Sequence, residues 1–505
     1  MKQKSISRIG SYSRALKINC RKPYILLLVL CGIGSFLIVV SGLFFGFTSY
    51  YTNDFLQEGP VFLAAATVLG AVMIPTLFRE LYNRQFADVE FSLPMSSSER
   101  FLAKLLAVGR YHLLPLAVVL AALIIFSAVI GDSSVMIGMS ISIITTAVYF
   151  DAVSMICVCC LGRLFESVYV PVVFATVLTL LPYVAFDRLV VAPSHHRIDT
   201  LQFFDLPFGV LSIMRIREEN YSYFENYGGD FIIKHLVCLV IYAAAIALAY
   251  RIYRRRNAVQ TGTPFVYRSF YIVFSFCVMV LLFMIFIYRE AYIGIIFALA
   301  VYAAISISAA RGAVTARTFI FTGETFFGTY LVTLALSFLA FVTGGFGFID
   351  SVPGSWIEVP LEQQTRTVHP IEMQFDGFLT VGRDTSDYRR YTISMTTPNF
   401  DPEVVRTVFR TARKYAYIDT SFEAYMDMMN DSVNYNEPCF YCDVDRFEDL
   451  NYKNHSVFYN CTPENFEKLL EELNGIEGIE VAEEKIIDDS IRGEGTEEFD
   501  SSDGE

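Results

Sequence analysis

The stretch from Phe78 to Leu114, FRELYNRQFADVEFSLPMSSSERFLAKLLAVGRYHLL, lies between two apolar runs that are each long enough to cross a bilayer. Pro94 ends any helix before it, because the residue ahead of a proline is disfavoured in helical conformation. Ser96 and Glu99 have the spacing of a capping box, in which each side chain bonds the backbone N–H of the other residue. The stretch therefore predicts a new helix from Ser96 to about Val108.

This expected helix has an apolar side and a basic side. Residues four apart share a helix face, so its side chains form three groups: Phe101 with Leu105, Leu102 with Leu106, and Arg100 with Lys104. Such a helix lies on the cytoplasmic face of a membrane or against a partner protein. The alternative is an ordinary polar loop between two membrane helices.

Composition places the chain among membrane proteins. Its 505 residues are 54% hydrophobic and 18% charged, whereas about 25% of residues are charged in a soluble protein. The net charge of −13 comes from acidic residues in the last third of the chain, while basic residues cluster between apolar runs. No basic block suits a nucleic acid, which excludes that class of partner.

Apolar runs recur along the first 350 residues, and each has about the 20 residues that cross a hydrocarbon core. They are 24–47, 61–78, 113–130, 135–161, 168–191, 231–253, 269–288, 291–310 and 326–348. The pattern predicts an all-α polytopic membrane protein with about nine transmembrane helices. The break at 289–290 is so short that the two runs beside it form either two spans or a re-entrant pair.

Lysine and arginine in the short loops set the orientation, because cytoplasmic loops carry an excess of them. Residues 1–23 hold seven basic residues and no acidic residue. They predict an interfacial helix on the inner leaflet, retained rather than cleaved as a signal peptide. Arg251–Arg256 also belong inside. We therefore expect a multi-pass plasma-membrane protein whose N-terminus is cytoplasmic and whose C-terminus, after nine spans, is extracytoplasmic.

The region 350–482 changes to short alternating apolar patterns. Alternation predicts strands at 371–375, 391–395 and 455–461. Pro402 and Pro463 each follow an N-capping residue and open a helix. These signals predict a C-terminal extracytoplasmic α+β domain, followed by an acidic, disordered tail at 483–505.

Motifs for chemistry are few. The sequence contains no G-x-x-x-x-G-K-[ST], no H-E-x-x-H and no G-x-S-x-G, so we expect no ATPase or hydrolase site and no cofactor in this chain. His195, His196 and Asp199 read as a solvated loop rather than a metal site. Three cysteines of the α+β domain leave a disulfide open: Cys439, Cys442 and Cys461. A zinc site is not expected there, because it would need a second pair of ligands at zinc spacing.

Asp151 is an acidic residue well inside the fourth apolar run. A charge within a bilayer is costly and usually has a function or a partner. Asp151 therefore either lines a transport path, pairs with another helix, or marks an interfacial position at the end of a shorter span.

The order of a basic N-terminal helix, two spans and an inner loop reading EFSLPMS at 90–96 and ERFLAK at 99–104 resembles permease subunits of ABC-2 type transporters from Gram-positive bacteria. The resemblance covers 24–253, which would form the six-helix membrane module of that family. Residues 254–349 would add three further transmembrane helices, and 350–482 and the tail have no counterpart in the six-helix plan.

The resemblance implies an exporter in which this chain is the membrane half of the pump. A separate ATPase would bind ATP and Mg²⁺, and the inner loop would act as its coupling helix, through Ser96, Glu99, Arg100, Phe101, Leu102, Lys104, Leu105 and Leu106. A second permease, identical or related, would complete the complex. The alternative is a membrane-anchored sensor or envelope-assembly protein whose external domain binds a ligand or partner. Substrate and direction stay open.

Overall fold

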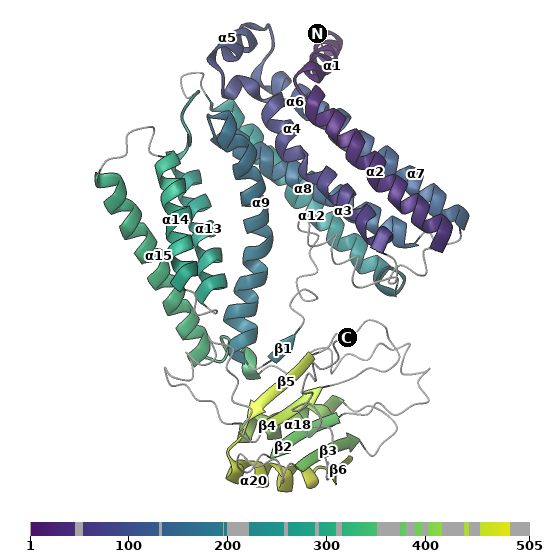
Figure 1. Cartoon of the computed structure of the whole chain (residues 1–505), viewed down its shortest axis with the longest axis vertical. Coiled ribbons are helices and arrows are strands. Elements are labelled where there is room, and N and C mark those ends of the chain that lie inside the picture. Colours follow the sequence, from purple (N-terminus) through teal and green to yellow (C-terminus); the bar gives the residue numbers. More distant parts are fainter. Residues whose placement is uncertain are drawn as a thin grey trace, which may run out of the picture. The chain divides into compact units, whose positions relative to one another are not determined.

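The computed structural model describes residues 2–45, 54–130, 134–194, 196–198, 222–256, 261–287, 292–309, 316–350, 374–379, 389–395, 402–416, 439–443 and 455–484. The chain forms two compact units (Figure 1). A helical unit comprises Met1–Ala185, Phe204–Ile287 and Ala291–Leu334, and a mixed unit comprises Phe186–Phe203, Tyr288–Glu290 and Ala335–Glu505.

Each of the nine predicted apolar runs is helical. The helices are α1 (Lys2–Ala15), α2 (Arg21–Phe45), α3 (Asp54–Val68), α4 (Gly70–Leu77), α5 (Arg84–Ser92), α6 (Ser97–Val108), α7 (Leu114–Ile130), α8 (Ser134–Cys160), α9 (Leu164–Phe186), α12 (Ser222–Arg254), α13 (Arg268–Ile287), α14 (Tyr292–Ala309) and α15 (Ala316–Val342). In the described part of the chain, seven helices are long and apolar enough to cross a membrane. Val61–Leu77 and Gly294–Ile307 are shorter apolar helices. The chain is a multi-pass helical membrane protein.

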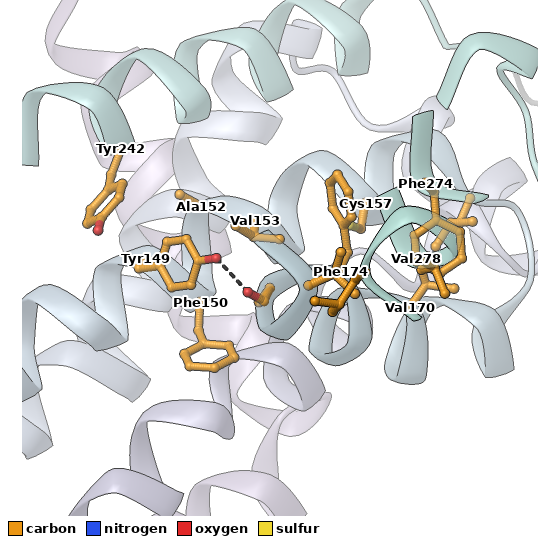
Figure 2. Packing of buried hydrophobic residues seen from close by; sticks show 14 of the residues in the cluster. Tyr149, Phe150, Ala152, Val153, Cys157, Val170, Phe174, Tyr242, Phe274 and Val278 are labelled. Carbon is orange, nitrogen blue, oxygen red and sulfur yellow. Dashed lines mark hydrogen bonds between the residues drawn. The ribbon is translucent and has the colours of Figure 1, made fainter. Parts of the chain in front are cut away.

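Helix α8 is the axis of the helical unit. In its apolar segment 83% is buried, against 22–39% in the other long apolar helices. It packs against α3, α4, α7 and α12 (Figure 1). Figure 2 shows one part of this core, where the Tyr149 hydroxyl donates to the backbone carbonyl of Ala175 on α9 at 2.7 Å. The ring of Tyr242 on α12 lies 5.4 Å from that of Tyr149, so this one residue of α8 contacts both α9 and α12.

The mixed unit contains a six-stranded antiparallel sheet in the order β1-β5-β4-β2-β3-β6. The strands are β1 (His196–Ile198), β2 (Gln374–Leu379), β3 (Arg389–Met395), β4 (Cys439–Asp443), β5 (His455–Asn460) and β6 (Ile479–Glu484). Helices α18 (Pro402–Tyr415) and α20 (Pro463–Asn474) pack together through Val408, Phe409, Phe466, Leu469 and Leu473, which are buried.

The strand and helix predictions for this unit are largely confirmed. β3, β5, α18 and α20 begin within two residues of the predicted positions, and the Thr462 side chain caps α20 by accepting from the Asn465 N–H. β2 overlaps the predicted strand only from residue 374, since 371–373 lie outside the described residues. β6 extends to Glu484, and the rest of the predicted tail lies outside the described residues.

Strand β1 was not predicted. It lies in the loop after α9 that the sequence indicated as solvated, and it adds an edge strand through the pairs His196–Val457 and Ile198–His455. Three residues are too few to show alternation, so only its partner reveals it.

The ends of α9 and α15 meet within the mixed unit. The rings of Phe186 and Phe348 lie 6.2 Å apart. Gly345, with φ +69°, lets the backbone after α15 approach that of Val190, because a Cβ at this position would lie 2.2 Å from the Val190 carbonyl oxygen. A residue with a side chain would push the two helix ends apart.

Candidate functional site

The predicted capping box is present at the start of α6. The Ser96 hydroxyl accepts from the Glu99 N–H at 3.2 Å, and Glu99 Oε2 accepts from the Ser96 N–H at 2.9 Å. Both interactions occupy backbone donors that have no partner within the helix. Loss of such a cap costs about 1 kcal/mol. The helix therefore has a defined first turn directly after Pro94.

The two predicted apolar pairs on α6 differ in burial. Phe101 is buried, with its ring 6.0 Å from that of Phe78 and 5.5 Å from that of Tyr253, and Leu105 packs partly into the same cluster. Leu102 and Leu106 are 45% and 48% exposed. Only the second pair is available to a partner protein.

The expected basic side of α6 is not a solvent face, and that part of the prediction is wrong. Lys104 is fully buried and pairs with two carboxylates, Glu80 and Glu90, the latter at 2.7 Å. Arg100 is 5% exposed and donates to the Glu90 carbonyl at 2.9 Å. The sequence shows that Arg100 and Lys104 share a helix face, but it does not show that the carboxylates of Glu80 and Glu90 pair with Lys104 in the folded chain.

Glu80 is the functional residue that sequence reasoning missed. It lies in a one-turn 3₁₀ helix, Arg79–Leu81, between α4 and α5, and is 1% exposed. Burial raises the pKa of its carboxyl to about 7, the Lys104 ammonium counteracts this in part, and the Glu90 carboxylate adds to it. The Tyr253 hydroxyl, on α12, lies 3.5 Å from Glu80 Oε1. Lys104 thus ties α6 to the loop after α4 and to α5.

Helix α6 continues into α7 without a loop. A π-helical turn, Gly109–Leu113, joins them, and helical structure runs from Ser97 to Val129. The sequence predicted a helix to about Val108 and a span from residue 113, and no structure was assigned to the residues between them. The wider π turn accommodates Arg110, which is exposed, and His112, which is buried.

His112 explains where Asp151 lies. Nδ1 of His112 is 3.0 Å from both carboxylate oxygens of Asp151, and Nε2 is 3.1 Å from the Ala66 carbonyl oxygen. Asp151 is 2% exposed, in the middle of α8. The geometry matches the helix-pairing alternative. A histidine eight residues beyond Lys104, next to the start of an apolar run, is the signal that points to the partner.

Gly70 makes room for this pair. It begins α4, directly after the break at Leu69 that ends α3. A Cβ on Gly70 would lie 2.1 Å from Asp151 Oδ1 and 2.9 Å from His112 Cε1. The break and the glycine together let α3 and α4 close over two polar side chains in an otherwise apolar core.

Arg256 joins three segments that are distant in sequence. Its buried guanidinium donates to the carbonyls of Val158 at 3.0 Å, Cys159 at 2.9 Å and Leu81 at 2.8 Å. The first two belong to the last turn of α8, where carbonyls lack helical partners and a cation is favourable. The residue therefore fixes the ends of α8 and α12 to the loop after α4.

No other predicted candidate forms a site in the described residues. Cys157, Cys159 and Cys160 are buried in α8, as packing predicts. His196 is in β1 and Cys461 is buried before α20, while His195 and Asp199 lie outside the described residues. Cys439 and Cys442 are in β4. The described part of the chain contains no group of three His, Cys, Asp or Glu side chains that could hold a metal.

No family model, no curated protein and no solved structure matches the chain.

Proposed function

We propose that this chain is the membrane-spanning permease subunit of an ATP-binding cassette exporter. ATP, with Mg²⁺, is hydrolysed by a separate cytoplasmic subunit, and a second permease completes the pump. The single observation that carries the proposal is helix α6. It is capped at Ser96, held by the buried Lys104 and continuous with the apolar helix α7.

Such a helix suits the transmission of motion. Closure of a soluble ATPase must displace membrane helices, and a helix transmits a push only if it does not bend or fray. The capping box prevents fraying, and the two ion pairs of Lys104 resist sliding because breaking a buried ion pair costs about 3–5 kcal/mol. The π turn before α7 places the hinge where His112 contacts Asp151.

The outer face of α6 is the docking surface in this proposal. Leu102 and Leu106 are the large apolar side chains that α6 leaves exposed, and they stand one turn apart. Buried apolar anchors of this kind dominate the binding energy of interfaces, at about 2 kcal/mol or more each. Phe101, which we first expected as an alternative anchor, holds α6 to α12 instead.

Contacts within the helical unit support a cytoplasmic N-terminus and inner loop. The Tyr111 hydroxyl donates to the Arg14 carbonyl at 3.3 Å, so α1 lies on the same side as α6. Arg256 joins the ends of α8 and α12 to the loop after α4. These segments all carry the arginine and lysine excess that favours the cytoplasm.

Pairing within the mixed unit constrains the number of crossings. β1 follows α9 and pairs with β5, which follows α15. Both strands must lie on one side of the membrane, so the helices between them must cross an even number of times. Four crossings, by α12, α13, α14 and α15, satisfy this and give the nine spans of the proposal. Two crossings, by α12 and α15 with α13 and α14 as a re-entrant pair, satisfy it too and place the sheet on the same side.

The test is purification of the tagged full-length chain from its native membrane. We expect a protein with a G-x-x-x-x-G-K-[ST] motif, and ATP hydrolysis, to accompany the wild-type chain. Leu102→Ala with Leu106→Ala should reduce both at least tenfold, since 1.4 kcal/mol is a factor of ten. The matched control is Leu114→Ala with Val118→Ala, which removes the same kind of exposed side chain from α7.

Three results would contradict the proposal. The first is a wild-type chain that is pure, folded and free of any ATPase under mild extraction. The second is full retention of the ATPase by the Leu102/Leu106 variant, which would exclude α6 as its dock. Transport by vesicles holding the chain without an ATPase would also rule out an ATP-driven pump.

A further inference from the structure

A cavity of about 450 Å³ lies where three connecting segments of the helical unit meet. Its walls are Tyr82, Arg84, Arg163, Thr261, Gly262, Thr263 and Pro264. These residues come from the segment after α4, the turn between α8 and α9, and the segment before α13. In the proposed topology all three segments are cytoplasmic. The volume falls in the range of about 300–1,000 Å³ typical of small-molecule sites.

Backbone pairing holds the walls in place. The Gly262 N–H donates to the Gly162 carbonyl at 2.8 Å, and the Val266 N–H donates to the Cys160 carbonyl at 2.8 Å. Arg163 Nε donates to the Gly262 carbonyl at 3.1 Å. The buried Arg256 fastens the segment after α4 to the end of α8. The cavity is therefore built into the fold rather than left between loose loops.

The charge in and around the cavity is positive. Arg84 is exposed and forms no ion pair with a carboxylate in the described part of the chain. Arg163 has one such partner, Glu166, at 3.6 Å, which neutralises it in part. The contacts of Arg256 are to uncharged carbonyl groups. The cavity walls thus hold two guanidinium groups, Arg84 and Arg163, against the single carboxylate of Glu166, and Arg256 adds its charge from behind the walls.

Hydrogen-bond donors accompany this charge. The Tyr82 hydroxyl is buried beside the Ser167 hydroxyl, so it is not counted among the free donors of the cavity. Thr261 adds a hydroxyl group to the walls, and the guanidinium groups of Arg84 and Arg163 offer only N–H donors. Donors in excess of acceptors, next to positive charge, match an oxyanion.

We propose that this cavity binds a phosphate group carried by a larger molecule. Arginine pairs with phosphate through two parallel N–H bonds, which its planar guanidinium fits better than lysine does. The volume exceeds what one phosphate fills, which leaves room for the alcohol esterified to it. Such a group belongs to an inner-leaflet phospholipid headgroup or to a soluble phosphate ester. The inference does not depend on the ATPase.

The experiment is native mass spectrometry of the full-length chain in a phosphate-free detergent. Three probes are titrated: dihexanoyl phosphatidylglycerol, glycerol 3-phosphate, and dihexanoylglycerol, which has the acyl chains without phosphate. We expect the first or the second to bind and the third not to bind. Arg84→Gln should weaken that binding about tenfold or more, because a hydrogen bond between charged groups is at stake. Arg110→Gln, an exposed arginine outside the cavity, is the control.

Each outcome of this experiment either identifies the source of the phosphate or overturns the proposal. Binding of phosphatidylglycerol alone identifies a lipid headgroup, whereas binding of glycerol 3-phosphate identifies a soluble ester. Equal affinity of the wild-type chain for the phosphate-bearing and phosphate-free lipids overturns the proposal without needing any variant. Binding that Arg84→Gln and Arg110→Gln weaken equally overturns it too, as does the absence of binding by every probe.

Discussion

The Nδ1 atom of His112 lies 3.0 Å from both carboxylate oxygens of Asp151, and this contact joins the π turn between α6 and α7 to the middle of α8. Both side chains are buried among apolar neighbours. The Ala66 carbonyl, beside the break between α3 and α4, contacts the other imidazole nitrogen. Two local irregularities, the π turn before α7 and the break between α3 and α4, therefore converge with the middle of α8 on one polar pair.

Asp151→Leu should destabilise the chain by about 3–5 kcal/mol, because it leaves the buried His112 without its ionic partner. The double variant His112→Leu with Asp151→Leu should recover much of this loss, since no polar side chain is then orphaned. Thermal unfolding in detergent measures both. If the single variant unfolds at the wild-type temperature, the pair does not hold the helices together.

Gly70→Ala should cost about 1–3 kcal/mol, because the added methyl overlaps Asp151 Oδ1 at 2.1 Å. The matched control is Gly323→Ala, where a Cβ meets no atom within 4 Å. This control should be neutral or stabilise α15, since alanine favours a helix over glycine by up to about 1 kcal/mol. Equal unfolding temperatures for the two variants would show that α4 moves aside freely.

Lys104→Met should destabilise the chain by about 3–5 kcal/mol, because it leaves the buried Glu80 and the half-buried Glu90 without their cation. The exposed Lys17 is the control, and Lys17→Met should change stability by less than about 0.5 kcal/mol. Detergent-solubilised thermal unfolding again provides the measurement. A near-neutral Lys104→Met would mean that α6 is held by its apolar contacts alone.

The pKa of Glu80, raised by burial to about 7, predicts a pH dependence of stability. Between the ordinary glutamate pKa and about 7, Glu80 keeps its proton in the folded chain but has lost it in the unfolded chain. The free energy of unfolding therefore falls as pH rises through this range. The contribution is complete below the ordinary glutamate pKa and is lost as pH passes through about 7. Glu80→Gln should flatten the curve over this window. A wild-type curve that is already flat, or rises, contradicts the shift.

Labelling with a membrane-impermeant thiol reagent tests the topology. Glu467→Cys, exposed on α20, should react in intact cells, and Ser92→Cys, exposed at the end of α5, should react only after the membrane is opened. Among the native cysteines whose burial the structure describes, all are buried except Cys277, which is half-buried, so background from these should be small. Reaction of Ser92→Cys in intact cells would reverse the proposed orientation.

Hydrophobic runs and local signals predicted much of the fold. Ser96 and Glu99 specified the start of α6, and Thr462 with Pro463 specified that of α20, because caps act over three or four residues. The sequence could not predict which face of α6 is buried. That depends on Glu80, 24 residues before Lys104, and no periodicity connects the two.

The remaining site features arise from contacts across the fold. From the sequence, Asp151 was recognised as a charge that is costly within a bilayer. Its contact with His112 was not predicted, because it depends on the π turn at the start of α7. Arg256 appeared to be one of several arginines that set orientation, whereas it caps the end of α8. Sequence patterns report which residues are out of place, and the packing of distant helices determines how each is satisfied.

The pairing of His196 with Val457 sets an order of events during synthesis. β1 emerges after α9, and its partner β5 emerges only after α12, α13, α14, α15 and α18 have been made. Until then the edge that β1 will occupy does not exist, and its backbone groups depend on water or a chaperone for hydrogen bonds. The sheet is thus one of the last parts of the molecule to form, and a chain truncated after α15 would keep its helices but leave β1 without a strand to join.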